Sequence, residues 1–355
     1  MTSRSMDGKS VPTRRTVLAS GLAMGATLAM PAIVRAADQE IVFATWGGSW
    51  ADAMQKAWFD PFQTKTGIAV KTVSGNTYGK IEAMVKAGRT EWDVVETLPD
   101  FQWIGAEKGL LAPIDFSVVN KSLIMQGADM VTPYSVPQVL FSEVLTYNTK
   151  FKPPPQGWAD LFDTAKFPGM RALDGGDIQD ALEGALLADG VAPSALYPLD
   201  VDRALKKLSA LRDSIQFFDT NAQGEQFLMD GQCTLGVLPD GRALNVRANG
   251  GPVDLQYNAT ITTWSTMVIP KGAPHLAAAQ QFLAFALTPE AQAAIAQAYT
   301  YGPVVPKAFD LISPERAKIL SGGPQMQGKA VLRNEKWWSE NLSAANEKFN
   351  AWKLG

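Results

Sequence analysis

Short apolar runs alternate with amphipathic stretches in the first third of the chain. Residues 40–46, 68–75 and 92–98 have the length and the β-branched content of strands. Between them, residues 50–63 and 77–88 place apolar side chains at the three- and four-residue spacing of a helix. This strand–helix alternation predicts a parallel, doubly wound α/β sheet.

The rest of the chain predicts a second α/β unit, reached through two strand-like runs at 132–151 and a proline-rich loop at 152–170. A β-rich segment at 253–273 precedes two helices, which Thr288 and Pro289 separate as an N-cap and a first-turn proline. We therefore expect a two-lobe α/β fold that binds a ligand at the carboxyl ends of its strands. The other elements of the second unit are expected at 170–176, 177–189, 200–212 and 233–241.

The N-terminus has the features of an export signal. Arg14 and Arg15 precede an uncharged segment rich in Ala, Gly and Leu, and Val34-Arg35-Ala36 offers small residues to a signal peptidase. We expect residues 1–36 to be a twin-arginine signal peptide, cleaved near Ala36, which would place the mature chain in the periplasm. A transmembrane anchor is the alternative, but the apolar run barely spans a bilayer.

Charge and composition exclude several classes of function. Without residues 1–36, the chain keeps 27 of its 32 Lys and Arg and 34 of its 35 Asp and Glu, a net charge of −7. An acidic chain without Lys/Arg runs is not expected to bind nucleic acid or an anionic membrane. Cys233 and His275 are the only residues of their types, so neither an internal disulfide nor a Cys/His metal site can form. We expect no cofactor.

The turn "TWGGSW" at residues 45–50 joins the first strand to a helix. Glycine amides at the start of a helix can accept an anion, but the Lys-Ser/Thr pair of a phosphate-binding loop is missing. Trp46, in the turn itself, is expected to stack against a ligand. Trp50 and Trp58 lie on the following helix and are expected in the core or on the lobe surface.

Three classes of function stay open at this point. The first is a binding protein for a small organic molecule. The second is a ferric-iron or anion binder, because Tyr299 and Tyr301 could supply phenolates. The third is an exported enzyme, which is disfavoured because no nucleophile–base pair is recognisable.

The order of several segments resembles the extracellular solute-binding proteins of ABC importers, in their spermidine/putrescine-binding-like branch. The most specific are the W-x-DLFD segment (158–163) and the helix "AAAQQFLAFALTPEAQ" (277–292). The order of the segments also includes "ATWGGSW", "EWDVV", "YSVP", "MVIPKGAPH" and "YGPVVPKA". The resemblance implies a type II periplasmic-binding fold that closes over its ligand and presents it to an inner-membrane permease, and no enzymatic activity. We also expect a monomer. The implied lobes are 38–142 plus 265–310 for lobe 1, and 143–264 plus 311–355 for lobe 2.

The family's pocket, carried over position by position, is only half retained. Trp46 matches the tryptophan of the first turn, but glycines stand where an acid that reaches an amine often follows. Asp177 and Asp180 match acids at the start of a helix in lobe 2; a helix cap and a solvated surface acid are the alternatives for these two. The implied ligand-binding residues are Trp46, Gly47, Gly48, Ser49, Thr97, Asp177, Asp180, Pro239, Trp264, Ser265, Tyr301 and Trp338.

These departures from the family pattern predict the charge of the ligand. A linear diamine needs carboxylates at both ends of its pocket, because each buried ammonium must be paired. Here Asp177 and Asp180 supply one end, whereas Gly48 and Ser265 occupy acidic positions at the other. We therefore expect a ligand with one cationic end and one neutral or anionic end, such as a small amino acid or a monoamine.

Overall fold

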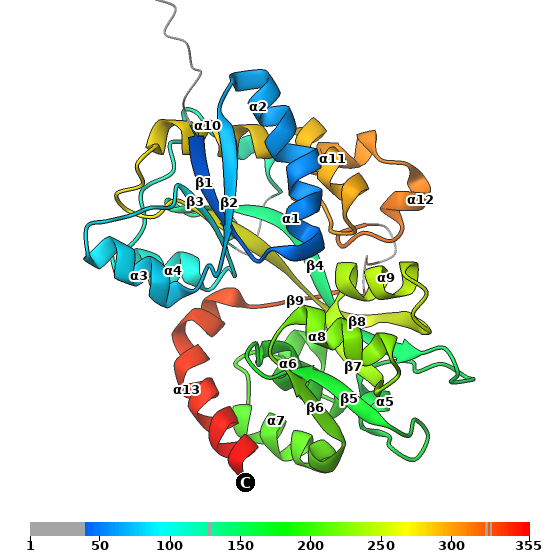
Figure 1. Ribbon diagram of the computed structural model, residues 1–355. Coiled ribbons are helices and arrows are strands. Elements are labelled where there is room, and N and C mark those ends of the chain that lie inside the picture. Colours follow the sequence, from blue (N-terminus) through cyan, green and yellow to red (C-terminus); the bar gives the residue numbers. More distant parts are fainter. Residues whose placement is uncertain (1–39, 126–128, 324–325, 327–328) are drawn as a thin grey trace, which may run out of the picture. The chain divides into compact units, whose positions relative to one another are not determined.

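Two long antiparallel strands, β4 (Ser135–Asn148) and β8 (Val253–Val268), lie side by side in the computed structural model (Figure 1). The structure describes residues 40–125, 129–323, 326 and 329–355, so the predicted signal peptide and its cleavage site near Ala36 lie outside the described residues. The two strand-like runs predicted at 132–151 form the single strand β4. Its pairing with β8 continues through register shifts after Pro137 and after Glu143.

Two groups of parallel strands flank β4 and β8. β1 pairs in parallel with β2 and β3 to form the sheet of lobe 1, and β5 pairs in parallel with β6 and β7 to form that of lobe 2. The described strands follow the order β2-β1-β3-β8-β4-β7-β5-β6, with β9 beside β8. The predicted two-lobe α/β class is confirmed. The strands are β1 (Glu40–Thr45), β2 (Ala69–Ser74), β3 (Val94–Thr97), β5 (Met170–Asp174), β6 (Ile215–Phe218), β7 (Cys233–Pro239) and β9 (Val331–Leu332).

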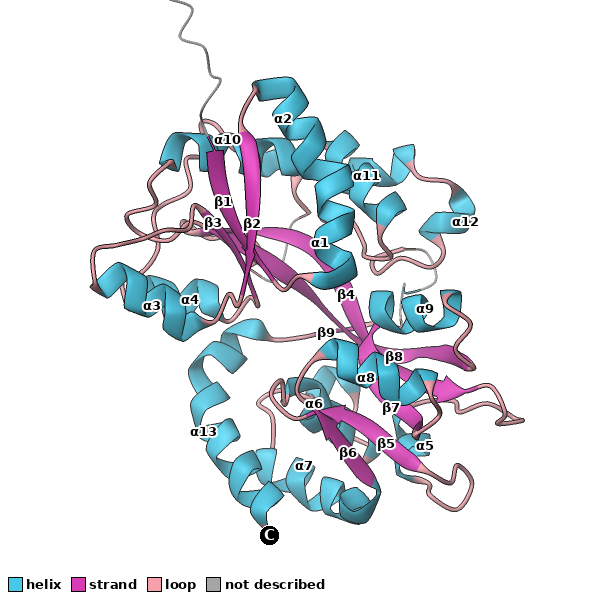
Figure 2. Cartoon of the chain, in the orientation of Figure 1, coloured by secondary structure: helices cyan, strands magenta, loops and turns pink. Residues whose placement is uncertain are grey.

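Helices flank both groups of strands (Figure 2). The expected helix at 50–63 consists of α1, a π-helical turn (Gln55–Phe59) and α2. The N-cap predicted at Thr288 is confirmed, because its side chain accepts a hydrogen bond from the Ala291 amide. The helices are α1 (Gly48–Met54), α2 (Asp60–Thr66), α3 (Tyr78–Lys86), α4 (Phe101–Glu107), α5 (Trp158–Phe162), α6 (Gln179–Ala188), α7 (Val201–Leu208), α8 (Asn221–Met229), α9 (Asp240–Ala248), α10 (Leu276–Ala286), α11 (Pro289–Ala298), α12 (Pro314–Ala317) and α13 (Glu335–Leu354).

The core of lobe 1 contains a cluster of aromatic rings. Phe62 meets Phe282 of α10 edge to face, with ring centroids 5.3 Å apart, and Phe43 of β1 meets the same ring at 5.5 Å. Trp58 is fully buried and donates from Nε1 to the Ala291 carbonyl at 2.9 Å. Edge-to-face pairs add to the free energy gained from burial alone. These contacts hold α2 and the π-helical turn before it against α10 and α11.

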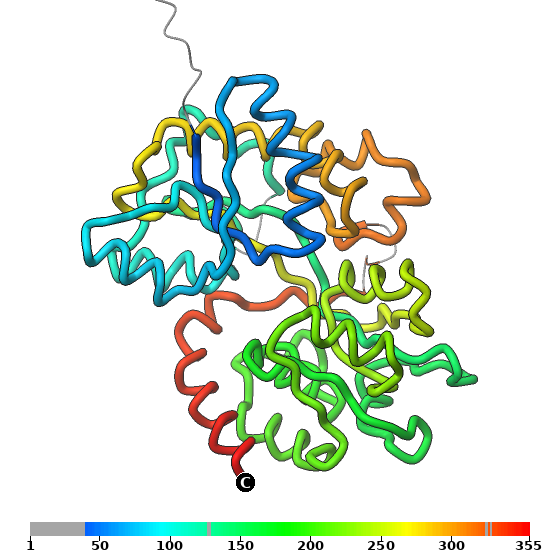
Figure 3. The backbone as a smooth tube through the Cα atoms, in the orientation of Figure 1, coloured from blue at the N-terminus to red at the C-terminus, as the bar shows by residue number. Residues whose placement is uncertain are grey.

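The core of lobe 2 forms between its sheet and the helices α6, α7 and α13. Leu173, Leu182 and Val237 are fully buried in it, together with Phe349 of α13. Figure 3 follows the chain along β4 and back along β8 between the lobes, and shows α13 (red) running away from their junction. None of the described helices is long and apolar enough to cross a membrane.

The segment after α11 packs on lobe 1. Ala308, Ile312 and Leu320 share a small apolar cluster with Ala293 and Ala296 of α11. The chain then reaches β9 beside β8 and continues into α13 on lobe 2. The residue boundaries of the lobes stay a prediction.

Candidate functional site

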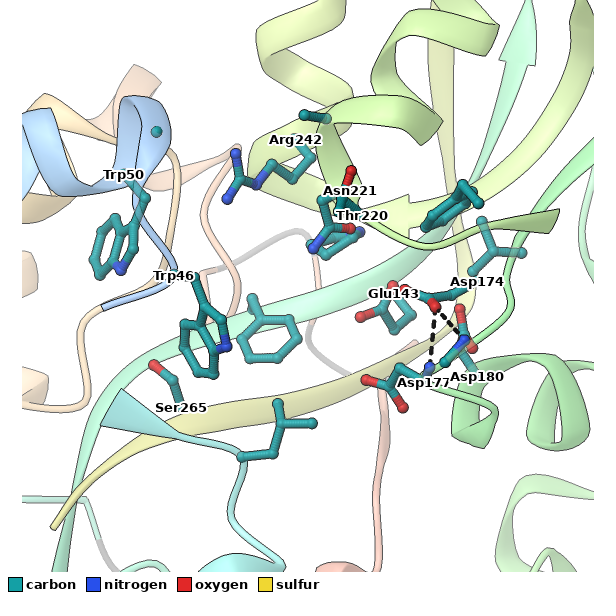
Figure 4. A pocket seen from close by; sticks show the side chains of 18 of the residues that line it. Trp46, Trp50, Glu143, Asp174, Asp177, Asp180, Thr220, Asn221, Arg242 and Ser265 are labelled. Carbon is teal, nitrogen blue, oxygen red and sulfur yellow. Dashed lines mark hydrogen bonds between the residues drawn. The ribbon is translucent and has the colours of Figure 1, made fainter. Parts of the chain in front are cut away.

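A cavity of about 620 Å³ lies where the carboxyl ends of the strands of both lobes meet. The turns β1–α1, β5–α6, β6–α8 and β7–α9 line it, as expected for parallel sheets, and β4 and β8 add side chains from their middle. Figure 4 shows this arrangement. The lining residues are Trp46, Gly47, Gly48, Trp50, Leu98, Phe141, Glu143, Asp174, Gly176, Asp177, Asp180, Phe218, Asp219, Thr220, Asn221, Ala222, Val237, Pro239, Arg242, Ser265 and Tyr301.

Five carboxylates line the lobe 2 side of this cavity; four of them are at least partly buried, and the fifth, Asp219, is exposed. Glu143 of β4 and Asp180 of α6 are 5% and 4% exposed. Asp174, at the end of β5, accepts hydrogen bonds at Oδ1 from the amides of Gly176 and Asp177, at 2.8 and 2.9 Å (dashed in Figure 4). These two bonds shape the turn that carries Asp177 to the cavity. We call Glu143, Asp174, Asp177 and Asp180 the acidic group.

Burial and mutual repulsion disfavour full ionisation of the acidic group. Burial raises the pKa of Asp180 well above its ordinary value, and the neighbouring charges of Glu143, Asp177 and Asp174 raise it further. Burial likewise raises the pKa of Asp174, to about 6, with Asp177 as the next cause. A cationic ligand would relieve this repulsion, because it favours the ionised carboxylates.

The cavity also presents a cation, Arg242, which lies in the first turn of α9 shortly after β7 ends at Pro239. Its side chain is 12% exposed, and Nη1 lies 3.3 Å from Oε1 of Glu225. Its Nε is buried without a hydrogen-bond partner among the described residues. Figure 4 shows Arg242 apart from the acidic group, with its guanidinium directed toward Trp50. The two ends of the cavity therefore carry opposite charges.

Aromatic rings form a wall of the cavity. Trp46 is 44% exposed, so much of its surface is open to the cavity. Trp50 is buried, and its ring lies 5.2 Å from Tyr301 and 5.4 Å from Tyr299, both edge to face. Trp50 was expected only in the core or on the lobe surface. It lines the cavity as well, because α1 begins immediately after the turn.

Most of the predicted ligand-binding residues reach the cavity. Of the others, Ser49 is exposed and Thr97 is buried at the end of β3. Trp264 is fully buried because successive side chains of a strand point to opposite faces, and its neighbour Ser265 takes the cavity face. Trp338 is fully buried and donates from Nε1 to Glu183 at 2.8 Å. The predicted residues that line the cavity are Trp46, Gly47, Gly48, Asp177, Asp180, Pro239, Ser265 and Tyr301.

Four charged residues that line the cavity were missed from the sequence, namely Glu143, Asp174, Asp219 and Arg242, and two of them had a signal there. Arg242 follows the predicted strand 233–241 directly, which is the position where the carboxyl-end rule places ligand contacts. Glu143 lies inside a strand-like apolar run, and a buried charge in such a run is itself unusual. Both signals were present in the sequence, but neither Glu143 nor Arg242 stands at a position that the family resemblance assigns to the pocket.

A second cavity, of about 590 Å³, adjoins the first. Trp46, Leu98, Gly176 and Asp177 line both cavities. In the second, Tyr78 donates to Asp100 at 2.5 Å, and burial is the main cause that raises the pKa of Asp100 to about 6. Within the described residues, no group of three or more His, Cys, Asp or Glu side chains is arranged to hold a metal ion.

Comparison with known sequences assigns the family. The sequence profile of the bacterial extracellular solute-binding proteins matches residues 57–320. The chain belongs to this family. The resemblance noted from the sequence is thereby confirmed.

Individual members of the family are similar over nearly the whole chain. The γ-aminobutyric acid-binding protein of Pseudomonas aeruginosa is 30% identical over 335 residues, which cover 92% of this chain and 94% of the relative. The solved Atu4243–GABA receptor is 36% identical, with a TM-score of 0.82 and coverage of 89% and 98%. A solved ABC transporter substrate-binding protein from Bradyrhizobium japonicum is 38% identical, with a TM-score of 0.84 and coverage of 89% and 99%. All three are binding proteins rather than enzymes.

Proposed function

We propose that this solute-binding protein holds a small zwitterion, an ω-amino acid such as γ-aminobutyrate. The observation that carries the proposal is the placement of Arg242 and the acidic group in one cavity. The ligand's ammonium would lie among Glu143, Asp177 and Asp180, and its carboxylate would face Arg242. The similarity to proteins that bind γ-aminobutyric acid supports the same ligand class.

The energetics favour a ligand with both charges. Charge-assisted hydrogen bonds to a carboxylate or a guanidinium offset the desolvation of each ligand end. Between the ends, Trp46 offers an apolar face to the methylene groups. A ligand that lacks one charge loses the charge-assisted hydrogen bonds at that end, so both halves of the ligand contribute to affinity.

A linear diamine of the same length fits less well. Its second ammonium would face the Arg242 guanidinium, and two like charges repel each other strongly in a cavity of low dielectric. The sequence predicted loss of the diamine site from missing acids at that end. The structure adds a cation there, which strengthens the argument against a diamine.

The remaining parts of the proposal concern location and partners. Residues 1–36 would direct export by the twin-arginine route, and the mature chain would act in the periplasm as a monomer without a cofactor. Closure of the two lobes around the ligand would stabilise the form that an ABC permease accepts, because the ligand contacts both lobes only when they are closed.

Isothermal titration calorimetry with four ligands tests the proposal. γ-Aminobutyrate should bind at least about tenfold more tightly than butylamine, butyrate or putrescine, because each of these lacks one charge or carries the wrong one. The variant Arg242→Gln should abolish the preference for γ-aminobutyrate over butylamine. The control is the variant Arg247→Gln. Arg247 is an exposed residue of the same helix and pairs with Asp254, so this variant should bind γ-aminobutyrate like the wild type. Tightest binding of putrescine would overturn the proposal.

A further inference from the structure

Glu96 lies behind the wall of the ligand cavity, at the centre of a hydrogen-bond network. It belongs to β3 and is fully buried. Oε1 accepts from the Trp46 amide and the Thr45 hydroxyl. Oε2 accepts from Nε1 of Trp50 at 2.9 Å and from Nε2 of Gln138 at 3.1 Å. One carboxylate thus contacts the turn after β1, the first turn of α1 and the strand β4.

Two further bonds extend this network to other parts of the wall. The Thr45 hydroxyl accepts from the Gly47 amide at 3.2 Å. Oε1 of Gln138 accepts from the Ser265 hydroxyl at 2.8 Å. The residues of the network that line the cavity are Trp46, Gly47, Trp50 and Ser265, whereas Glu96 itself does not line it.

The chemistry of the network calls for an ionised carboxylate. An ionised carboxylate only accepts hydrogen bonds, and here each oxygen receives two donors. Burial raises the pKa of Glu96, and the four donated bonds oppose that rise. Among the described residues, no Lys, Arg or His forms an ion pair with Glu96. An apolar side chain would fill the same space without the free-energy cost of desolvating a charge, so packing alone does not explain a glutamate at this position.

We propose that Glu96 is a positioning residue for ligand binding, which fixes the Trp46 turn and the Trp50 ring before the ligand arrives. The proposal rests on the proposed function, because Trp46 and Trp50 are the aromatic wall for that ligand. Preorganised walls raise affinity, because less freedom is lost when the ligand binds.

The variant Glu96→Gln tests this role with little change in shape. Glutamine replaces one acceptor oxygen by a donating amide group. The amide group can take the position of either oxygen. In the Oε2 position it removes the acceptor of Trp50 Nε1, and in the Oε1 position it removes the acceptor of the Trp46 amide, because both of these groups can only donate. We expect the affinity for γ-aminobutyrate to fall about tenfold or more. Unchanged affinity would overturn the proposal.

A double-mutant cycle with Trp50→Phe separates action through Trp50 from a general effect. If Glu96 acts through Trp50, the double variant should lose about as much affinity as the worse single variant. If the affinity losses of the two single variants multiply in the double variant, Glu96 does not act through the Trp50 ring, and this part of the proposal is overturned. Gln138→Met cuts the link to Ser265 while keeping the charge and the fold, and should weaken binding severalfold; normal binding would contradict the network.

Asp93→Asn is the matched control. Asp93 is also fully buried in lobe 1 and accepts hydrogen bonds from the amides of Val42 and His275, at 2.8 and 2.7 Å, but it does not line the cavity. Both Asp93→Asn and Glu96→Gln should lower the melting temperature, whereas only Glu96→Gln should weaken binding. Equal losses of affinity would reduce Glu96 to a structural residue and overturn the proposal.

The indole N–H resonance of Trp50 in the free protein gives a readout without ligand. A hydrogen bond to a carboxylate shifts this proton downfield, so Glu96→Gln should move it upfield while Asp93→Asn leaves it in place. No movement in Glu96→Gln would overturn the proposal. If wild-type protein does not bind γ-aminobutyrate, the proposed function fails, but this resonance still tests the positioning of Trp50.

Discussion

Arg242 and Glu225 form a largely buried ion pair beside the ligand cavity. Nη1 of Arg242 lies 3.3 Å from Oε1 of Glu225, and the two side chains are 12% and 16% exposed. Oε2 of Glu225 accepts a hydrogen bond from Nδ2 of Asn245 at 3.0 Å, which holds the carboxylate in turn. Glu225 does not line the cavity, so the guanidinium is the charge that this end presents to a ligand.

Asp180→Asn should separate affinity from stability. Burial and the neighbouring carboxylates disfavour the ionised form of Asp180, so a neutral replacement should not lower the melting temperature of the free protein. The same change removes a partner of the ligand ammonium and should weaken γ-aminobutyrate binding by roughly 10- to 100-fold. Calorimetry and thermal unfolding measure the two effects. Normal binding would place the ammonium elsewhere.

Binding should strengthen as pH rises from about 5 to about 8. A carboxyl and an alkyl ammonium both stay charged over this range, so the change comes from the protein. Burial raises the pKa of Asp174 to about 6, and it raises the pKa of Asp180 well above its ordinary value. Ionisation of the acidic group strengthens its attraction for the ligand's ammonium group, so the affinity should increase.

The raised pKa values of these buried carboxyl groups also determine how folding stability depends on pH. A carboxyl with a raised pKa in the folded state stabilises the fold at low pH, and this contribution is lost as pH rises through the folded pKa. The melting temperature of the free protein should therefore fall between about pH 5 and pH 8, while the ligand-induced increase grows. Unfolding scans with and without γ-aminobutyrate measure both. An affinity that does not change with pH would contradict a cation site in the acidic group.

Gly241→Ala should weaken binding without changing any polar group. A Cβ at this position would lie 2.6 Å from Cε1 of Tyr301 and 2.9 Å from Cε1 of Tyr299, so the ring that lines the cavity must shift. We expect at least a severalfold loss of affinity. Gly79→Ala in α3 is the control, because no atom lies within 4 Å of its Cβ, and it should stabilise the helix by about 0.5–1 kcal/mol. Equal affinities for the two variants would exclude Tyr301 from the site.

Trp338→Phe should affect stability alone. Trp338 is fully buried in lobe 2 and donates from Nε1 to Glu183 at 2.8 Å and to Tyr197 at 3.0 Å. Loss of these bonds and of ring volume should lower the free energy of unfolding by about 2–4 kcal/mol. The affinity for γ-aminobutyrate should stay within about twofold of wild type. A large loss of affinity would restore Trp338 to the pocket, where the family resemblance had placed it.

The sequence predicted the fold well, because strand and helix periods depend on local spacing. The general position of the cavity, at the carboxyl ends of the strands, follows from where strands end. Asp177 and Asp180 were placed by the family resemblance, and both line the cavity. The sequence did not predict which face of β8 is buried, so Trp264 was assigned to the cavity together with its neighbour Ser265. Arg242 was missed although it directly follows the predicted strand 233–241, because it stands at no position that the family resemblance assigns to the pocket.

A crystal structure of the wild-type protein with γ-aminobutyrate is the most direct measurement. The ligand carboxylate should lie within hydrogen-bond distance of Arg242, and its ammonium should contact at least two of Glu143, Asp177 and Asp180. The Trp46 ring should cover the methylene groups. A ligand bound in the reverse direction, or outside this cavity, would contradict the proposed function.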